Sequence, residues 1–156
     1  MDGRIPVVLI AAAAVAAGVG VWYAQEYGYY ERLDPSAAPV TVMVDGQAQP
    51  LATEGVEAIT ASSSPIRWRA CFRLMEPVPA NAEPFAGATP LVGPNWFSCF
   101  DAAQIGADLT SGAAKAYLSQ PEIRPDVDRV IAVYPDGRAF GWHQFNDKTP
   151  ERGVMD

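Results

Sequence analysis

Few side chains in this sequence can do acid–base or metal chemistry. His143 is the only histidine, and Cys71 and Cys99 are the only cysteines. A catalytic or metal-bound histidine needs suitable partners nearby, so we expect His143 to be structural or exposed. No P-loop, dinucleotide fingerprint, G-x-S-x-G or H-E-x-x-H pattern occurs. We therefore expect a protein that is not an enzyme and has no cofactor and no metal site.

Charged residues suggest two further kinds of site, each less specific: an anion site and an acid–base pair. Arg67, Arg69 and Arg73 would share one face of a strand with Cys71. Such a row can bind an anion, but a solvated or ion-paired sheet face is the commoner outcome. Two carboxylate pairs have spacings that would suit acid–base work, although an exposed, salt-linked role is much commoner: Asp126 with Asp128, and Glu54 with Glu57.

The start of the chain predicts a membrane anchor. Residues 5–23 contain no charged side chain, and as a helix they span about 28 Å, close to the thickness of a hydrocarbon core. A signal peptide has a shorter apolar stretch and a small residue at the −3 position. Cleavage after Ala24 would put Trp22 there. We expect residues 1–33 to be a retained transmembrane anchor helix.

Flanking residues predict its orientation. Arg4 lies before the apolar run, so the positive-inside rule puts the N-terminus in the cytoplasm of a bacterial inner membrane and the following domain in the periplasm. Aromatic residues gather at the outer end. They predict a belt at the membrane interface, or else the first residues of the folded domain: Trp22, Tyr23, Tyr27 and Tyr30.

The middle of the anchor is rich in small residues. Ala14 with Gly18, and Ala16 with Gly20, are pairs four residues apart. Such pairs let a second helix approach closely, and they favour packing against the transmembrane helices of a larger complex. The alternative is that bacterial spans are often alanine-rich without a specific reason.

Roughly 130 residues follow the anchor, enough for one domain. The net charge of −7 argues against nucleic acid as a partner. It would suit a basic periplasmic carrier such as cytochrome c, although solubility alone explains it. In the oxidising periplasm, Cys71 and Cys99 predict one disulfide, since no C-x-x-C or C-x-x-C-H pattern is present.

The pattern of the domain predicts an α+β fold, with a small antiparallel sheet and one main helix. A linker at 34–39 leads into a periplasmic domain over 40–145, and a polar tail follows at 146–156. Strands are predicted at 40–44 and 66–74, and a hairpin at 127–134 and 138–145. Helices are predicted at 53–60 and, with Asp101 as its cap, at 101–119.

Residues 76–95 contain five prolines and little periodicity. A connection of this length without regular structure is uncommon unless it has a function or a partner orders it. This segment is our candidate docking loop. The equal alternative is an irregular loop without a function. Its marked residues are Pro77, Pro79, Pro84, Phe85 and Pro90.

Four segments carry a resemblance to a known family. They are YGYY at 27–30, SSPIRWRACF at 63–72, WFSCFD at 96–101 and VYPDGRAFGWHQ at 133–144. The chain resembles, over nearly its whole length, a family of single-span membrane proteins of unknown function from alphaproteobacteria. Some members are labelled histidine kinases, which a single histidine and the missing nucleotide boxes contradict. The resemblance implies the topology and no mechanism.

These observations favour a non-catalytic accessory subunit of a larger inner-membrane complex. An energy-transducing complex, respiratory or photosynthetic, is our expectation, because an acidic periplasmic face can assist a basic electron carrier. Two alternatives are a periplasmic sensing or ligand-binding module and an assembly factor for a membrane complex.

Overall fold

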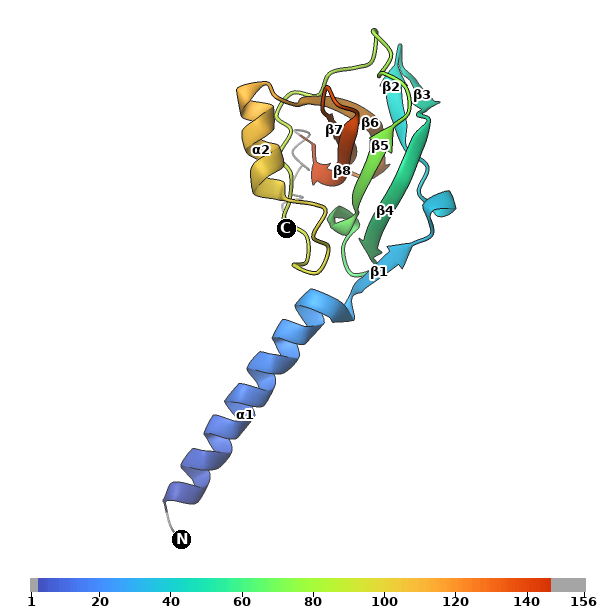
Figure 1. Cartoon of the computed structure of the whole chain (residues 1–156). Helices are drawn as coiled ribbons and strands as arrows, with labels where there is room; N and C mark the ends of the chain where they lie inside the picture. The colour runs from blue at the N-terminus through green and yellow to red at the C-terminus, as the bar shows by residue number, and fades with distance from the viewer. Residues whose placement is uncertain (1–2, 147–156) are drawn as a thin grey trace, which may run out of the picture.

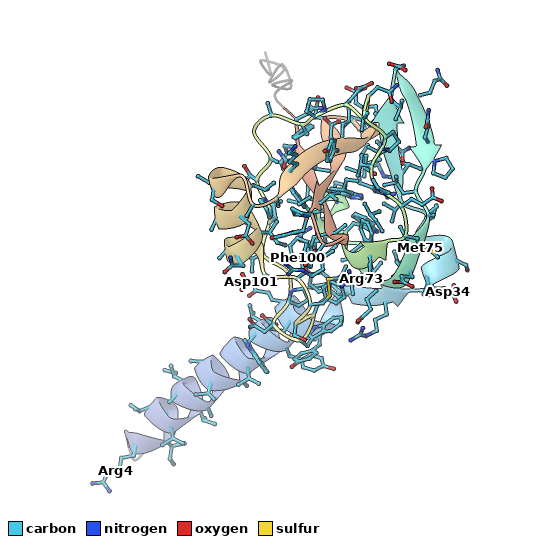
Figure 2. The ribbon with its side chains drawn as sticks, turned by 45° about the horizontal axis from the view of Figure 1, so that its top comes forward. Arg4, Asp34, Arg73, Met75, Phe100 and Asp101 are labelled. Atoms are coloured by element: carbon cyan, nitrogen blue, oxygen red, sulfur yellow. A yellow bond between two sulfur atoms is a disulfide. The ribbon has the colours of Figure 1, made fainter. Side chains whose placement is uncertain are left out.

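The computed structural model describes residues 3–146, so the predicted tail lies outside the described residues except for Asn146. The chain begins with helix α1 (Arg4–Tyr23), which one π-helical turn (Ala24–Gly28) extends. Figure 1 shows this helix projecting from one end of the domain, and Figure 2 shows Arg4 at its far end. The helix is long and apolar enough to cross a membrane, and none of its residues is buried within the chain.

A six-stranded antiparallel sheet forms the centre of the domain. Its strand order is β1-β4-β5-β8-β7-β6. The strands are β1 (Tyr30–Leu33), β4 (Thr53–Ala61), β5 (Arg69–Leu74), β8 (Arg138–Phe145), β7 (Val127–Val133) and β6 (Lys115–Arg124). With α2 (Ala102–Ser111) as the second helix, the predicted α+β class, an apolar helix followed by an antiparallel sheet domain, is confirmed.

A two-stranded hairpin, β2 (Thr41–Val44) and β3 (Gln47–Pro50), lies beside the sheet. The irregular segment 82–85 connects the hairpin to β6. Ala82 forms a bridge with Val44, and Pro84 forms one with Tyr117. The hydroxyl of Thr41 also donates to the carbonyl of Ser119, 3.0 Å away. The β-structure therefore continues past β6 and encloses an apolar core.

The alternation of β5 separates two cores. Ala70, Phe72 and Leu74 face a cluster that includes the buried valines of β2. Cys71 faces the other side, where Phe100 and Ile105 belong to a second cluster beneath α2. Both faces of this strand are therefore covered, which explains why an alternating sequence is buried at nearly every position.

The predicted helix at 53–60 is wrong. These residues form β4, which pairs with β1 on one side and β5 on the other. Val56 and Ile59 are three residues apart, a spacing that also suits a helix. A bulge between Glu54 and Glu57 shifts the register, and Gly55 there has φ +60°. This irregularity hides the simple alternation of a strand.

The predicted helix at 101–119 is correct only in its first half. Asp101 caps it as expected, since its carboxylate accepts from the backbone N–H of Gln104 at 3.0 Å. Gly112 then ends the helix in the left-handed conformation, with φ +80°. The residues from Lys115 onward form β6 instead, and Pro121 lies within that strand.

The other strand predictions are confirmed, with small shifts of their ends. The segment 40–44 contains β2, and the hairpin at the C-terminus is β7 and β8. Of the strand predicted at 66–74, only Arg69–Leu74 is β5, because a 3₁₀ turn at Pro65–Arg67 precedes it. The sheet also begins inside the stretch assigned to the anchor, because Tyr30–Leu33 is β1. The linker at 34–39 is ordered, with a 3₁₀ turn at Pro35–Ala37 capped by Asp34.

Gly141 of β8 allows Trp68 to pack against the sheet. A Cβ at this position would lie 2.8 Å from two carbons of the Trp68 indole. We predict that Gly141→Ala lowers the free energy of unfolding by about 2 kcal/mol or more, because both groups are buried and the ring cannot retreat. Urea unfolding of the full chain in detergent micelles, followed by tryptophan fluorescence, measures this.

Gly106→Ala is the matched control. A Cβ there meets only Pro90, at 4.0 Å, and the position lies inside α2. Alanine should stabilise the helix by about 0.5–1 kcal/mol. Equal effects of the two substitutions would contradict the packing described for Trp68.

Candidate functional site

The most elaborate constellation of side chains lies where α1 meets the domain. Glu26, in the π-helical turn, reaches the loop before α2. Its carboxylate accepts the backbone N–H of Asn95 at 3.0 Å and the side-chain amide of Asn95 at 3.3 Å. The indole N–H of Trp96 donates to the Glu26 carbonyl. The end of the helix is therefore attached to the segment 95–96 by three hydrogen bonds.

Ring contacts extend this attachment to β1. Tyr30 meets the Trp96 ring edge to face, with centroids 6.3 Å apart. The guanidinium of Arg32 lies 5.0 Å from the centre of the same indole. Arg67 lies 5.4 Å from the Tyr30 ring and 5.9 Å from the Tyr29 ring. Cation–π contacts of this kind contribute about 0.5–2 kcal/mol each. Contacts with both Trp96 and Arg67 therefore hold β1 in place.

Arg69 holds the start of the same loop, at Leu91 and Val92, by hydrogen bonds. It is 3 % exposed, and its guanidinium donates to backbone carbonyls. Nε donates to Leu91 at 2.6 Å and one Nη to Val92 at 3.2 Å. The other Nη donates to Ile66 and Trp68, both at 2.7 Å. Burial lowers the pKa of Arg69 to about 10, so the side chain remains charged at neutral pH.

The predicted disulfide between Cys71 and Cys99 is confirmed, with a Cα–Cα distance of 6.3 Å. It joins β5 to the end of the loop and encloses the candidate docking loop. Figure 2 shows the bond next to Phe100. Closing a loop of 28 residues stabilises a fold by about 3–4 kcal/mol. Together with Arg69 and Glu26, the disulfide fixes residues 91–99, which we call the junction loop.

The structure separates the three arginines that would have shared one face. Arg69 is buried beneath the junction loop, whereas Arg67 contacts the tyrosines of the helix end. Arg73 is exposed at the other end of β5 and donates to the carbonyl of Asp136 at 2.6 Å. They do not converge on one anion. The expectation of a solvated face fails at Arg69 because the junction loop and α2 cover that side of the sheet.

His143 has a structural place. Its Nε2 accepts from Nε of Arg129 at 3.0 Å, and its Nδ1 lies 2.7 Å from the carbonyl of Pro65. The ring stacks on Trp68 with centroids 4.9 Å apart. An imidazole that accepts from arginine and donates to a carbonyl is neutral. Burial lowers its pKa to about 3, in agreement with the structural role expected from the sequence.

The carboxylate pairs do not form an acid–base centre. Asp128 is buried and accepts from the backbone N–H of Glu122 and from the side chain of Asn146. Glu57 pairs with Arg32 at 3.7 Å. Within residues 3–146, no group of three His, Cys, Asp or Glu side chains gathers in a way that could hold a metal ion.

The predicted docking loop has no helix and no named strand, and the chain itself orders part of it. Pro84 and Phe85 pair with β6, and Phe85 also packs on the core beneath α2. Pro77 is exposed and Pro79 is half-buried. Pro90 lies against the α2 glycine, Gly106. The docking role of this loop stays a prediction.

The predicted residues of the anchor are exposed along α1. This holds for the small residues Ala14, Ala16, Gly18 and Gly20. Trp22, Tyr23 and Tyr27 are also exposed and form a ring cluster with centroid distances of 5.5 and 5.9 Å. Tyr30, assigned to the same belt, is half-buried in the junction. Sequence reasoning missed Glu26, Asn95 and Trp96, because no local pattern announces contacts 70 residues apart.

A family model described as "Family of unknown function (DUF6446)" matches residues 26–152. The match starts at Glu26, the residue that attaches the helix to the junction loop, and it includes the sheet and α2. This agrees with the resemblance to a family of unknown function. No curated protein and no solved structure matches the chain.

The buried, neutral His143 makes the stability pH-dependent. The unfolded chain takes up a proton near pH 6.5, whereas the folded chain does so only near pH 3. We predict that the free energy of unfolding is about 2 kcal/mol lower at pH 5 than at pH 8. Urea titrations of the full chain in micelles measure this. His143→Gln should lose the dependence between pH 8 and 5, and a variant that keeps it contradicts the prediction.

The contacts of Trp96 predict how firmly β1 is held. Trp96→Ala removes a hydrogen bond to the helix end and the ring beneath Arg32. We expect trypsin to cleave after Arg32 about 5–30-fold faster, as local opening becomes 1–2 kcal/mol easier. Trp22→Ala is the control, because Trp22 contacts only Tyr27 among the described aromatic rings. Equal cleavage rates for the two variants would contradict the attachment.

Proposed function

The chain belongs to the DUF6446 family of unknown function, and from that starting point we propose that it is a non-catalytic accessory subunit of a larger membrane complex. In this proposal α1 anchors the chain in the bacterial inner membrane. The N-terminus with Arg4 lies in the cytoplasm, and the sheet domain lies in the periplasm, where an oxidising environment suits the Cys71–Cys99 disulfide.

One observation carries the proposal. Helix α1 is firmly attached to the domain at its end, yet none of its twenty residues is buried by the chain. An anchor that served only to hold the domain near the membrane would need no fixed angle between the two. A fixed angle is useful when the helix and the domain contact the same partner, one within the bilayer and the other outside it.

The small residues give that partner two surfaces. Ala14 and Gly18 lie on one face of α1, and Ala16 and Gly20 lie on another, about 160° away. A Cβ added at Gly18 or Gly20 meets nothing within 4 Å among residues 3–146. Either face is therefore open to a second helix, which dispersion and close packing would hold.

The charge of the protein supports a role beside electron transfer. The net charge of −7 would raise the local concentration of a basic carrier such as cytochrome c. We include an energy-transducing complex, respiratory or photosynthetic, in the proposal on this ground.

Native purification tests the proposal. The full chain, extracted from its own membranes with a mild detergent, should migrate with a much larger complex. We predict that Gly18→Leu or Gly20→Leu releases at least about nine-tenths of the chain from the complex, since a bulky side chain prevents close helix approach. Val19→Leu is the control, because it adds one carbon on a face between the two pairs.

Two results contradict the proposal. One is a wild-type chain that migrates alone after mild extraction. The other is loss of the complex itself when the gene is deleted, because an accessory subunit leaves a lighter complex behind whereas an assembly factor leaves none.

A further inference from the structure

A second feature of the domain lies near the junction but uses different residues. A cleft of about 780 Å³ opens between the ends of β1 and β4 on one side and the β6–β7 turn on the other. Its walls include Arg124 and Arg129, three hydroxyl side chains and the His143 ring. Figure 1 shows β1 and the end of β4 next to the end of α1.

The guanidinium of Arg129 is available to bind an anion. Its guanidinium lies 4.2 Å from the centre of the Trp68 ring. Its Nε donates to the neutral His143, and one Nη donates to the carbonyl of Pro39 at 3.5 Å. Within residues 3–146, neither Arg129 nor Arg124 has a carboxylate within ion-pair distance. Burial lowers the pKa of Arg129, so the site carries a partly desolvated positive charge that no described carboxylate meets at ion-pair distance. Such a charge is costly unless an anion meets it.

The hydroxyl groups complete a set of donors. Thr60 is the second-last residue of β4, Ser62 lies in the turn that follows, and Ser64 precedes the 3₁₀ turn Pro65–Arg67. None of these three hydroxyls makes a hydrogen bond within the part of the chain that the structure describes. Guanidinium groups match the oxygens of a phosphate, and hydroxyl groups can satisfy the oxygens that remain.

We propose that this cleft binds a phosphate group through Arg124, Arg129 and the hydroxyls of Thr60, Ser62 and Ser64. The position of the cleft points to the phosphate of a phospholipid headgroup. Ala61 in its wall pairs with Tyr30, only two residues after the helical segment ends at Gly28. Headgroups occupy roughly 5–8 Å beyond the hydrocarbon core. Glu31, the carboxylate in the wall, can accept from a hydroxyl or ammonium of the same headgroup.

The inference is independent of the accessory role, since an anchored protein can hold a lipid with or without a larger complex. It also differs from an anion site formed by Arg67, Arg69 and Arg73, because Arg69 donates to four backbone carbonyls instead. None of these three arginines lines this cleft.

Two probes identify the source of the phosphate. The full chain in detergent micelles is titrated with inorganic phosphate, and its fluorescence is followed, since Trp68 stacks on Arg129. Separately, the chain is reconstituted in nanodiscs that contain phosphatidylglycerol, returned to detergent and analysed by native mass spectrometry for retained lipid.

We expect one phospholipid to remain bound, and Arg124→Gln to weaken its retention about tenfold, the effect of losing one charge-assisted hydrogen bond. Ser62→Ala should weaken it in the same direction but less. Arg138→Gln is the matched control, because it removes the same charge from a strand end far from the cleft. Arg129→Gln should abolish binding, provided that its fluorescence spectrum stays native.

Each outcome of these two experiments either supports or overturns the proposal. Retained lipid that depends on Arg124 supports a headgroup site. Saturable binding of inorganic phosphate that depends on Arg124, without retained lipid, supports the same phosphate chemistry with a free ligand. Equal retention by the wild type, Arg124→Gln and Arg138→Gln, or no binding of either probe, overturns the proposal.

Discussion

The path of the junction loop, and through it the attachment of α1, depends on the burial of one charged group, the Arg69 guanidinium. Burying a charge is unfavourable unless its donors are satisfied, and four backbone carbonyls satisfy them here. Two of these carbonyls belong to Leu91 and Val92, so the requirement of the arginine fixes the path of the junction loop. The loop then presents Asn95 and Trp96 to Glu26. The direction of the helix follows from an interaction inside the domain.

The disulfide and the arginine act on the same segment from different positions. Cys99 is covalently attached to the middle of β5, and Arg69 is the first residue of that strand. The loop is thereby fixed at both ends, and the side chain of Val92, at the end held by Arg69, remains 79 % exposed. With the exposed Trp22, Tyr23 and Tyr27 close by in sequence to Glu26, the domain presents an apolar and aromatic surface around the point where the helix leaves it. That arrangement supports the proposed position of the domain at the surface of a bilayer.

Local patterns in the sequence were enough for the elements whose signals are local. The apolar run of α1, the turn between β7 and β8 and the Asp101 cap were all predicted, as was the cysteine pair. The failures have a common physical reason. Gly55 and its bulge hide β4, and Gly112 ends α2 where the apolar pattern continues into β6. Contacts between Glu26 and Trp96, or between His143 and Arg129, depend on tertiary proximity that no spacing in the chain expresses.

We infer that α1 and the domain form one rigid unit. The distance distribution between spin labels placed at Val19→Cys and Ser111→Cys, measured by pulsed electron resonance on the full chain in nanodiscs, tests it most directly. We expect a single narrow distribution in the wild-type background, and we expect Arg69→Met to broaden it. A broad distribution in the wild-type background, unchanged by Arg69→Met, would contradict it.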